Sequence, residues 1–209
     1  MIFKLLHVIS GYIFWILTQR ILGLEILPHD CIVDRVHQFV EPINNYLRKN
    51  QNFMRYNFIL SSFLIDINIL YIVFQYLLTD DNTKTITLLF SGFVLRQICQ
   101  YINKLPSPKK LIWFNPDFPS LFVTYSVEND FFFSGHTLLA FIIGFDIISN
   151  GNLILQLYGI VFIIYEICII IFTYSHYFMD IYAAVATYFM LNYFYDYINS
   201  ETAFPHLAP

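Results

Sequence analysis

Two histidines and one aspartate have the types and spacing of a catalytic group. His136 follows Ser134 and Gly135 near the start of an apolar stretch, FFFSGHTLLAFIIGF. His176 and Asp180 are four residues apart in HYFMD, a spacing that predicts one shared helix face. A carboxylate there can accept a hydrogen bond from the imidazole and fix its tautomer. The other ring nitrogen is then free to attack or to take a proton.

The composition is that of a multi-spanning membrane protein. Of the 209 residues, 57% are hydrophobic and only 12% are charged, whereas soluble domains average about a quarter. There is too little polar surface here to cover a soluble globule. The net charge of −4 and the lack of a long lysine or arginine run argue against a nucleic-acid partner. The three cysteines are scattered and indicate neither a disulfide framework nor a zinc site.

The apolar segments predict an all-α fold, an integral membrane bundle of six transmembrane helices. We expect one domain over residues 1–209. Several segments approach the ~20 residues that cross a bilayer. The predicted spans are 5–24, 56–78, 85–103, 131–149, 152–173 and 177–196. The polar stretch 25–55 is expected to include an interfacial helix, and the proline-rich stretch 104–120 to form a loop.

This layout returns both histidines to the same membrane face. His136 opens the fourth span, the chain turns at SNGN (149–152), and the fifth span returns to His176. Each of the two helices would be ~30 Å long. Free N–H groups at the helix start formed by Ser134 and Gly135 favour an anion. Two histidines, a carboxylate and an anion site at the interface indicate chemistry on a lipid phosphate.

SGHT followed 40 residues later by HYFMD resembles the type 2 phosphatidic acid phosphatase superfamily of membrane phosphotransferases. Within it, NDFFFSGHT and HYFMDIYAA are most similar to the sphingomyelin synthase and related headgroup-transferase branch. The segment with DFP at 117–119 also resembles the plant phosphatidylcholine:diacylglycerol cholinephosphotransferases. The resemblance extends over residues 90–190, half of the chain.

The resemblance implies a role for each residue of the group. His176 would be the nucleophile that takes the phospho-headgroup as a phosphohistidine, and Asp180 would orient it. His136 would protonate the departing lipid alcohol and then deprotonate the incoming one. The implied partners are a phospholipid donor, with phosphatidylcholine leading, and a lipid alcohol acceptor, ceramide or diacylglycerol. No cofactor or metal is implied, and a homo-oligomer is compatible with the sequence.

Two differences from the phosphatase branch bear on the predicted reaction. The phosphatase branch carries an upstream Lys-and-Arg-Pro motif, which is missing here, and an arginine six residues before the second histidine, where this chain has Ile170. A phosphate monoester brings about two negative charges and a diester about one, so a site with few cations suits the diester. This favours headgroup transfer. The alternatives are a lipid phosphate phosphatase and a non-catalytic membrane transport or scaffold protein.

Besides the helix start at Ser134 and Gly135, three residues are candidates for substrate binding. Asp130 matches an aspartate at the same offset in the transferase branch, and could counter a choline cation or hydrogen-bond its own loop. Arg96 could bind the phosphate, or pair with an acid such as Asp66 or Asp130. The ring of Tyr177 could contact a quaternary ammonium group. A metal site of two histidines and one carboxylate is chemically possible, although the resemblance needs none.

The orientation in the membrane has two conflicting indications. Six spans place both termini on one face and the histidines on the other. The cations expected on the histidine face are Arg20, Arg35, Arg48, Lys49, Arg55, Lys104, Lys109 and Lys110, against Lys4 and Lys84 opposite. The positive-inside rule then predicts a cytoplasmic site. The resemblance implies a lumenal or outer site, so the organelle and the active-site face stay open.

Overall fold

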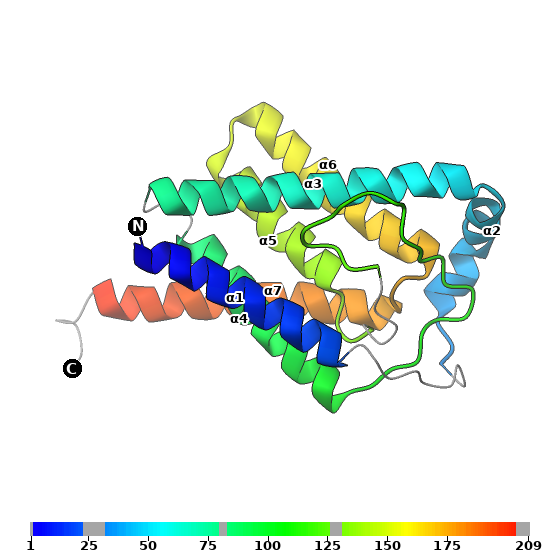
Figure 1. Cartoon of the computed structure of the whole chain (residues 1–209), viewed down its shortest axis with the longest axis horizontal. Coiled ribbons are helices and arrows are strands. Elements are labelled where there is room, and N and C mark those ends of the chain that lie inside the picture. Colours follow the sequence, from blue (N-terminus) through cyan, green and yellow to red (C-terminus); the bar gives the residue numbers. More distant parts are fainter. Residues whose placement is uncertain (1, 23–31, 80–82, 126–130, 204–209) are drawn as a thin grey trace.

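The computed structural model describes residues 2–22, 32–79, 83–125 and 131–203. Over these residues the chain forms seven α-helices and no β-strand (Figure 1). Their bounds are α1 (Ile2–Leu22), α2 (Arg35–Lys49), α3 (Gln51–Leu78), α4 (Thr83–Ile102), α5 (Gly135–Asn150), α6 (Leu153–Thr173) and α7 (Phe178–Ala203). The all-α prediction is confirmed, and each predicted span coincides with a helix. The helix expected within 25–55 is α2, and the predicted loop 104–120 contains no helix or strand.

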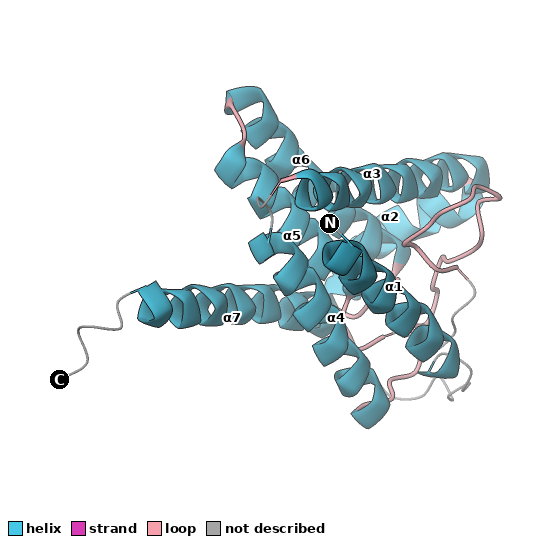
Figure 2. Ribbon diagram, turned by 60° about the vertical axis from the view of Figure 1, so that its left-hand side comes forward, coloured by secondary structure: helices cyan, strands magenta, loops and turns pink. Residues whose placement is uncertain are grey.

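Four helices are long and apolar enough to cross a membrane: α1, α3, α4 and α6. The other two predicted spans differ in character. Helix α5 has 16 residues and is therefore about 24 Å long, less than the ~30 Å of a hydrocarbon core. Helix α7 carries polar side chains such as Asn192 and Asp196 along its length. Figure 2 shows the C-terminal half of α7 extending away from the other helices.

The span predicted to begin at residue 131 begins as a helix only at Gly135. Ser134 is the N-cap, because its backbone is extended and its side chain accepts the N–H of Thr137 at 3.2 Å. Serine is favoured at this position, since it satisfies one of the donors that a helix start leaves unpaired. The three phenylalanines before it therefore lie in the connecting segment.

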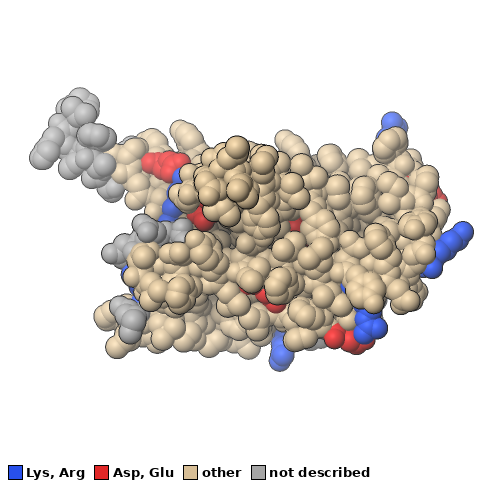
Figure 3. All heavy atoms as spheres, turned by 90° about the horizontal axis from the view of Figure 1, so that it is seen from above, with Lys and Arg blue, Asp and Glu red and all other residues tan. Residues whose placement is uncertain are grey.

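Charge is distributed unevenly over the surface. The start of α1 and the end of α7 lie at one end of the molecule, and α2 lies at the opposite end (Figure 1). On the face in Figure 3, several lysine and arginine side chains gather toward the α2 end, and the middle carries few charges. Large apolar side chains such as Val161 and Ile164 of α6 are more than half exposed. Such a surface suits contact with lipid.

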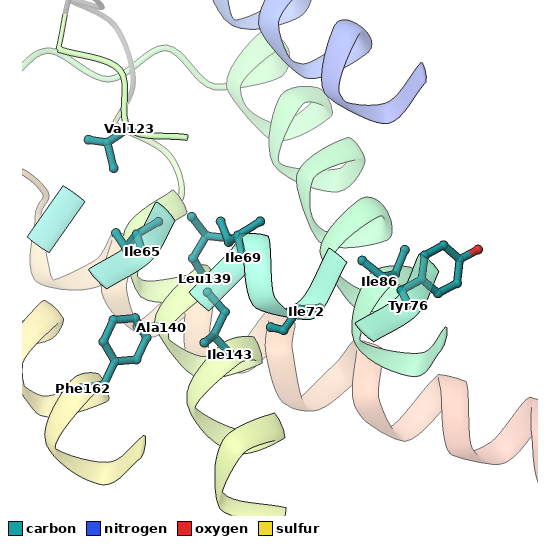
Figure 4. Packing of buried hydrophobic residues seen from close by; sticks show 10 residues of the cluster. All are labelled: Ile65, Ile69, Ile72, Tyr76, Ile86, Val123, Leu139, Ala140, Ile143 and Phe162. Atoms are coloured by element: carbon teal, nitrogen blue, oxygen red, sulfur yellow. The ribbon is translucent and has the colours of Figure 1, made fainter. Parts of the chain in front are cut away.

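A buried apolar cluster joins the central helices. Ile65, Ile69 and Ile72 recur at helical spacing along α3 and meet Leu139 and Ile143 of α5 (Figure 4). Side chains from α4, α6 and the loop complete the cluster: Ile86, Phe162 and Val123. The cluster fixes α5, and with it the segment that carries His136, against α3 and α6.

Two glycines let α5 and α6 approach closely. A Cβ at Gly159 would lie 2.8 Å from the carbonyl oxygen of Gly144, and a Cβ at Gly144 would lie 2.4 Å from Ile163. Small residues at such a crossing allow two backbones to come close in a membrane protein. The turn after Asn150 reverses the chain, so the two helices form the predicted hairpin.

Helix α2 presents one stripe of side chains to the end of α6. The buried residues are His37, Val40, Asn44 and Leu47, spaced by three or four positions. Asn44 donates to the carbonyl oxygen of Phe172 at 2.9 Å. Helix α2 is thereby attached to the chain just before His176.

Asp66 of α3 holds the loop that follows α4. Its carboxylate accepts the backbone N–H groups of Leu121 and Phe122 and the hydroxyl of Ser120, at 2.9 to 3.1 Å. The pairing of Arg96 with Asp66 that the sequence allowed is not made. A carboxylate that already receives three loop donors is satisfied without a cation.

Candidate active site

His176 lies in the short junction between α6 and α7. Tyr174 ends α6 in the left-handed conformation, with φ at 58°, and its N–H bonds back to the carbonyls of Ile170 and Ile171. Helix α7 then begins at Phe178. The prediction that His176 and Asp180 share one helix face is therefore wrong, because the left-handed residue stops α6 before the histidine and only Asp180 is helical.

Asp180 still lies beside His176. Its Oδ2 is 3.7 Å from His176 Nδ1 and accepts the N–H of Tyr177 at 3.0 Å. The second contact resembles a capping box, in which an acid in the first turn receives the N–H just before its own helix. Asp180 is fully buried, and its Oδ1 makes no hydrogen bond within the described part of the chain. One carboxylate thus starts α7 and faces the imidazole.

A contact with the backbone of Phe131 indicates which ring nitrogen of His176 carries the proton. Nδ1 lies 3.3 Å from the carbonyl oxygen of Phe131. A carbonyl only accepts and Asp180 also accepts when ionised, so Nδ1 carries the proton. In the neutral imidazole this leaves the lone pair on Nε2. The side chain of His176 is only 5% exposed, so bulk water has little access to the ring.

The SGHT and HYFMD motifs lie against each other. Besides the contact between His176 and Phe131, the N–H of Ser134 donates to the carbonyl oxygen of Asp180 at 3.2 Å. These two hydrogen bonds connect the start of α5 to the start of α7. The two motifs therefore lie together in the structure, and their common membrane face stays a prediction.

His136 is half-buried in the first turn of α5. Its ring meets the indole of Trp113 edge to face, with centroids 5.5 Å apart. Trp113 comes from the loop that Asp66 anchors, and it also packs against Phe58 and Tyr125. The loop therefore contributes one wall around His136, a part that the histidine motifs do not reveal.

Arg96 lies directly behind the SGHT backbone. It is 2% exposed, and its Nε donates to the carbonyl oxygen of Phe133 at 2.9 Å. A Cβ at Gly135 would lie 3.0 Å from that Nε and 3.1 Å from Cζ. Glycine at 135 therefore makes room for a guanidinium beside the start of α5. Among polar side chains, Gln19 accepts from Arg96 at 3.2 Å.

Two predicted substrate-binding residues remain, Tyr177 and Asp130. Tyr177 reaches the junction, but its hydroxyl donates to the carbonyl oxygen of Pro106 at 3.1 Å. Its burial raises the pKa of that hydroxyl to about 12. Asp130 lies outside the described residues. Within the described part of the chain, no group of three or more His, Cys, Asp or Glu side chains could hold a metal ion.

Two residues of the α2 region support the junction and were not singled out by the sequence. Asp34 caps α2 by accepting the N–H of Val36 at 2.8 Å, and it also accepts the N–H of Phe178 at 2.6 Å. One carboxylate thus begins both α2 and α7. The residue type marks Asp34 as a helix cap, but nothing in the local pattern indicates its second, distant helix.

His37 is the second such residue. Its Nε2 lies 2.9 Å from the carbonyl oxygen of His176, and its ring stacks on Tyr174 with centroids 4.0 Å apart. The hydroxyl of Tyr174 donates to the carbonyl oxygen of His37. Burial lowers the pKa of His37, and the carboxylate of Asp34, 4.0 Å away, partly opposes that shift. The neutral ring donates from Nε2, so it holds the junction without adding a charge.

Comparison with known proteins identifies the family of the chain. Residues 33–197 match the family model described as AtPDCT1/2, the phosphatidylcholine:diacylglycerol cholinephosphotransferase family. No curated protein and no solved structure matches the chain significantly. The match begins next to Asp34 and includes both histidine motifs, α2 and the loop. The chain therefore belongs to the phosphatidylcholine:diacylglycerol cholinephosphotransferase family.

Proposed function

We propose that this protein transfers phosphocholine from phosphatidylcholine to diacylglycerol through a phosphohistidine at His176. The observation that carries the proposal is the contact of His176 Nδ1 with the carbonyl of Phe131 and with Asp180. It directs the lone pair of Nε2 away from both acceptors. The contact also attaches the nucleophile to the segment that leads into His136.

In the first step, Nε2 of His176 attacks the phosphorus of phosphatidylcholine. The bond from phosphorus to the glycerol oxygen breaks, and protonated His136 gives that oxygen its proton. Diacylglycerol leaves, and phosphocholine stays on His176. The modified imidazole is positive, and the carboxylate of Asp180 stabilises it across 3.7 Å.

In the second step, the hydroxyl of another diacylglycerol attacks the same phosphorus. Neutral His136 takes the hydroxyl proton, and the bond from phosphorus to Nε2 breaks. Phosphatidylcholine with new acyl chains is released, and both histidines return to their starting states. Water takes no part, which agrees with the burial of His176.

The charges around the site suit a phosphodiester. The start of α5 favours an anion, and the guanidinium of Arg96 lies behind it next to Gly135. Ile170 stands where the phosphatase branch has an arginine, and it is 1% exposed. A diester brings about one negative charge, which one neighbouring cation can balance. This favours transfer over hydrolysis of a phosphate monoester.

The test uses purified protein in lipid nanodiscs with choline-labelled phosphatidylcholine. Diacylglycerol of distinct chain length, or ceramide, is added as acceptor. We expect labelled phosphatidylcholine with the chains of the added diacylglycerol, and no such product from His176→Ala. Labelled sphingomyelin would identify ceramide as the acceptor, and labelled phosphocholine in water would show that the protein is a hydrolase. No product from folded protein would favour the non-catalytic alternative.

The intermediate has its own assay. Without acceptor, intact-protein mass spectrometry should show wild-type protein heavier by one phosphocholine group, and His176→Ala unmodified. His136→Ala should slow the appearance of this species, since the departing alcohol then lacks its acid. Transfer without any modified protein would replace the two-step mechanism by direct displacement.

A further inference from the structure

Helix α2 carries a second apolar stripe, and this stripe is exposed. Phe39, Ile43 and Tyr46 follow one another at spacings of four and three residues, so they share one helix face. Phe39 is 86% exposed, Tyr46 is 61% exposed and Ile43 is 41% exposed. The buried stripe of α2, which packs against α6, lies on a different side of the helix. Large apolar side chains that are exposed together indicate a surface that contacts a partner or a membrane.

Four exposed cations accompany this stripe: Arg35, Arg48 and Lys49 of α2, and Lys109 of the loop after α4. Lys109 lies beside α2, because the next residue, Lys110, forms an ion pair with Glu41, the one acid of α2. Within the described part of the chain, no carboxylate forms an ion pair with any of the four. The α2 end of the molecule therefore has an excess of positive charge, and lysine and arginine side chains gather there in Figure 3.

Helix α2 lies across the end of a helix that is long and apolar enough to span a membrane (Figure 1). Asn50 alone separates α2 from α3. Helix α3 has 28 residues and is therefore about 42 Å long, more than the ~30 Å of a hydrocarbon core. Its polar residues Gln51, Asn52 and Arg55 are at the α2 end, so the excess length extends into the headgroup layer there. Helix α2 is thus held at the level of the lipid headgroups.

We propose that α2 and Lys109 bind the headgroups of anionic phospholipids, with Phe39, Ile43 and Tyr46 inserted between the acyl chains. A helix in the interface that combines an apolar face with lysine and arginine binds anionic membranes through both burial and charge. A phospholipid without net charge brings an ammonium group that these cations repel, so charge selects the anionic class. The level of α2 at the headgroups favours a lipid over a soluble protein as the partner.

The bound surface also sets the depth of the candidate active site. His37 lies in the buried stripe of α2, and its Nε2 donates to the carbonyl oxygen of His176 at 2.9 Å. Asn44 of the same stripe donates to the carbonyl oxygen of Phe172. The junction with His176 is therefore attached to a helix at the headgroup level, where the phosphates of phospholipids lie. The lipid contact itself requires no transfer reaction.

The first test measures binding without turnover. Equal amounts of phosphatidylglycerol and phosphatidylethanolamine, with identical acyl chains, are added to the purified full chain in detergent, and retained lipids are counted by native mass spectrometry. We expect wild type to retain mainly phosphatidylglycerol, and Arg35→Gln/Lys49→Gln to lower the ratio of the two lipids at least about 5-fold. The charge-matched Lys4→Gln/Lys84→Gln removes two cations from the starts of α1 and α4 and should keep the wild-type ratio. No preference in wild type, or an equal loss in both double variants, would refute the proposal.

A second measurement locates the apolar stripe in the bilayer. A photoreactive benzoylphenylalanine replaces either Phe39 or Gln38, both of which are exposed, in nanodiscs that contain phosphatidylglycerol. Gln38 lies outside the stripe. Intact-protein mass spectrometry after irradiation should show lipid adducts at position 39 and at least about 5-fold fewer at position 38. Equal labelling at the two positions, or adducts at position 39 only with a second copy of the chain, would show that the stripe does not insert among lipids.

Discussion

His37 donates from Nε2 to the carbonyl oxygen of His176 at 2.9 Å, although 139 residues separate the two. This bond joins the amphipathic helix α2 to the junction between α6 and α7. It fixes the backbone of His176, while Phe131 and Asp180 fix its ring. The position of His176, the proposed nucleophile, therefore depends on three separate parts of the chain.

Replacing His37 should slow the reaction without removing it. His37→Ala deletes one neutral hydrogen bond to the junction, so we expect kcat to fall roughly 2- to 10-fold with little change in KM. His37→Gln can still donate to the carbonyl of His176 and should recover part of the rate. Initial-rate kinetics in nanodiscs provide the measurement, and a rate in His37→Ala equal to wild type would remove His37 from the support of the site.

The same histidine should make stability depend on pH. Burial lowers the pKa of His37 below its usual value of 6.5, with the carboxylates of Asp34 and Asp180 opposing the shift. The unfolded chain therefore takes up the proton more readily than the folded one. The stabilisation is complete above the unfolded pKa and is lost as pH falls below it.

Thermal unfolding tests the predicted loss of stability at low pH. Between about pH 7.5 and about pH 5.5, the melting temperature of wild type should fall more than that of His37→Gln, because glutamine does not titrate in this range. Stacking on Tyr174 and Tyr177 adds no charge to His37, so the groups that oppose its pKa shift are the carboxylate of Asp34, the carbonyl oxygen of His176 and the carboxylate of Asp180. Parallel curves for the two proteins would show that another group causes the pH dependence.

Two substitutions at Asp180 should separate its two contacts. Asp180→Asn keeps an oxygen for the N–H of Tyr177 but loses the charge beside His176. We expect a rate at least about 10-fold lower, with a melting temperature near wild type. Asp180→Ala also loses the cap, which should cost about 1 kcal/mol of stability. Equal melting temperatures for Asn and Ala would show that the cap contributes nothing.

The crossing of α5 and α6 should tolerate no added methyl group. In Gly159→Ala, the Cβ would lie 2.8 Å from the backbone oxygen of Gly144, which cannot rotate away. We expect a loss of about 1–3 kcal/mol, as for other overpacked sites. The matched Gly11→Ala meets only the Phe90 ring at 3.2 Å, and that ring can move. Denaturant or thermal unfolding should therefore rank Gly159→Ala as the less stable protein.

Much of the architecture could be predicted because its signals are local. Apolar runs of near-membrane length predicted the helices, and prolines predicted the loop between α4 and α5. Ser134 before Gly135 indicated a helix start, and the structure confirms the N-cap. The apolar pattern did not predict where each helix begins. The apolar pattern already begins at Phe131–Phe133, whereas the N-cap Ser134 starts the helix only after them.

The types and spacing of His136, His176 and Asp180 by themselves predicted the kind of chemistry proposed for this site and the return of both motifs to one place. Only the tertiary structure decided that His176 lies outside a helix, that the carbonyl of Phe131 holds its Nδ1, and that Arg96 lies behind Gly135. It also decided the roles of Asp34 and His37. The physical reason is that helices and caps arise from neighbouring residues, whereas these contacts join groups 37 or more residues apart, and chain order does not record which distant groups meet.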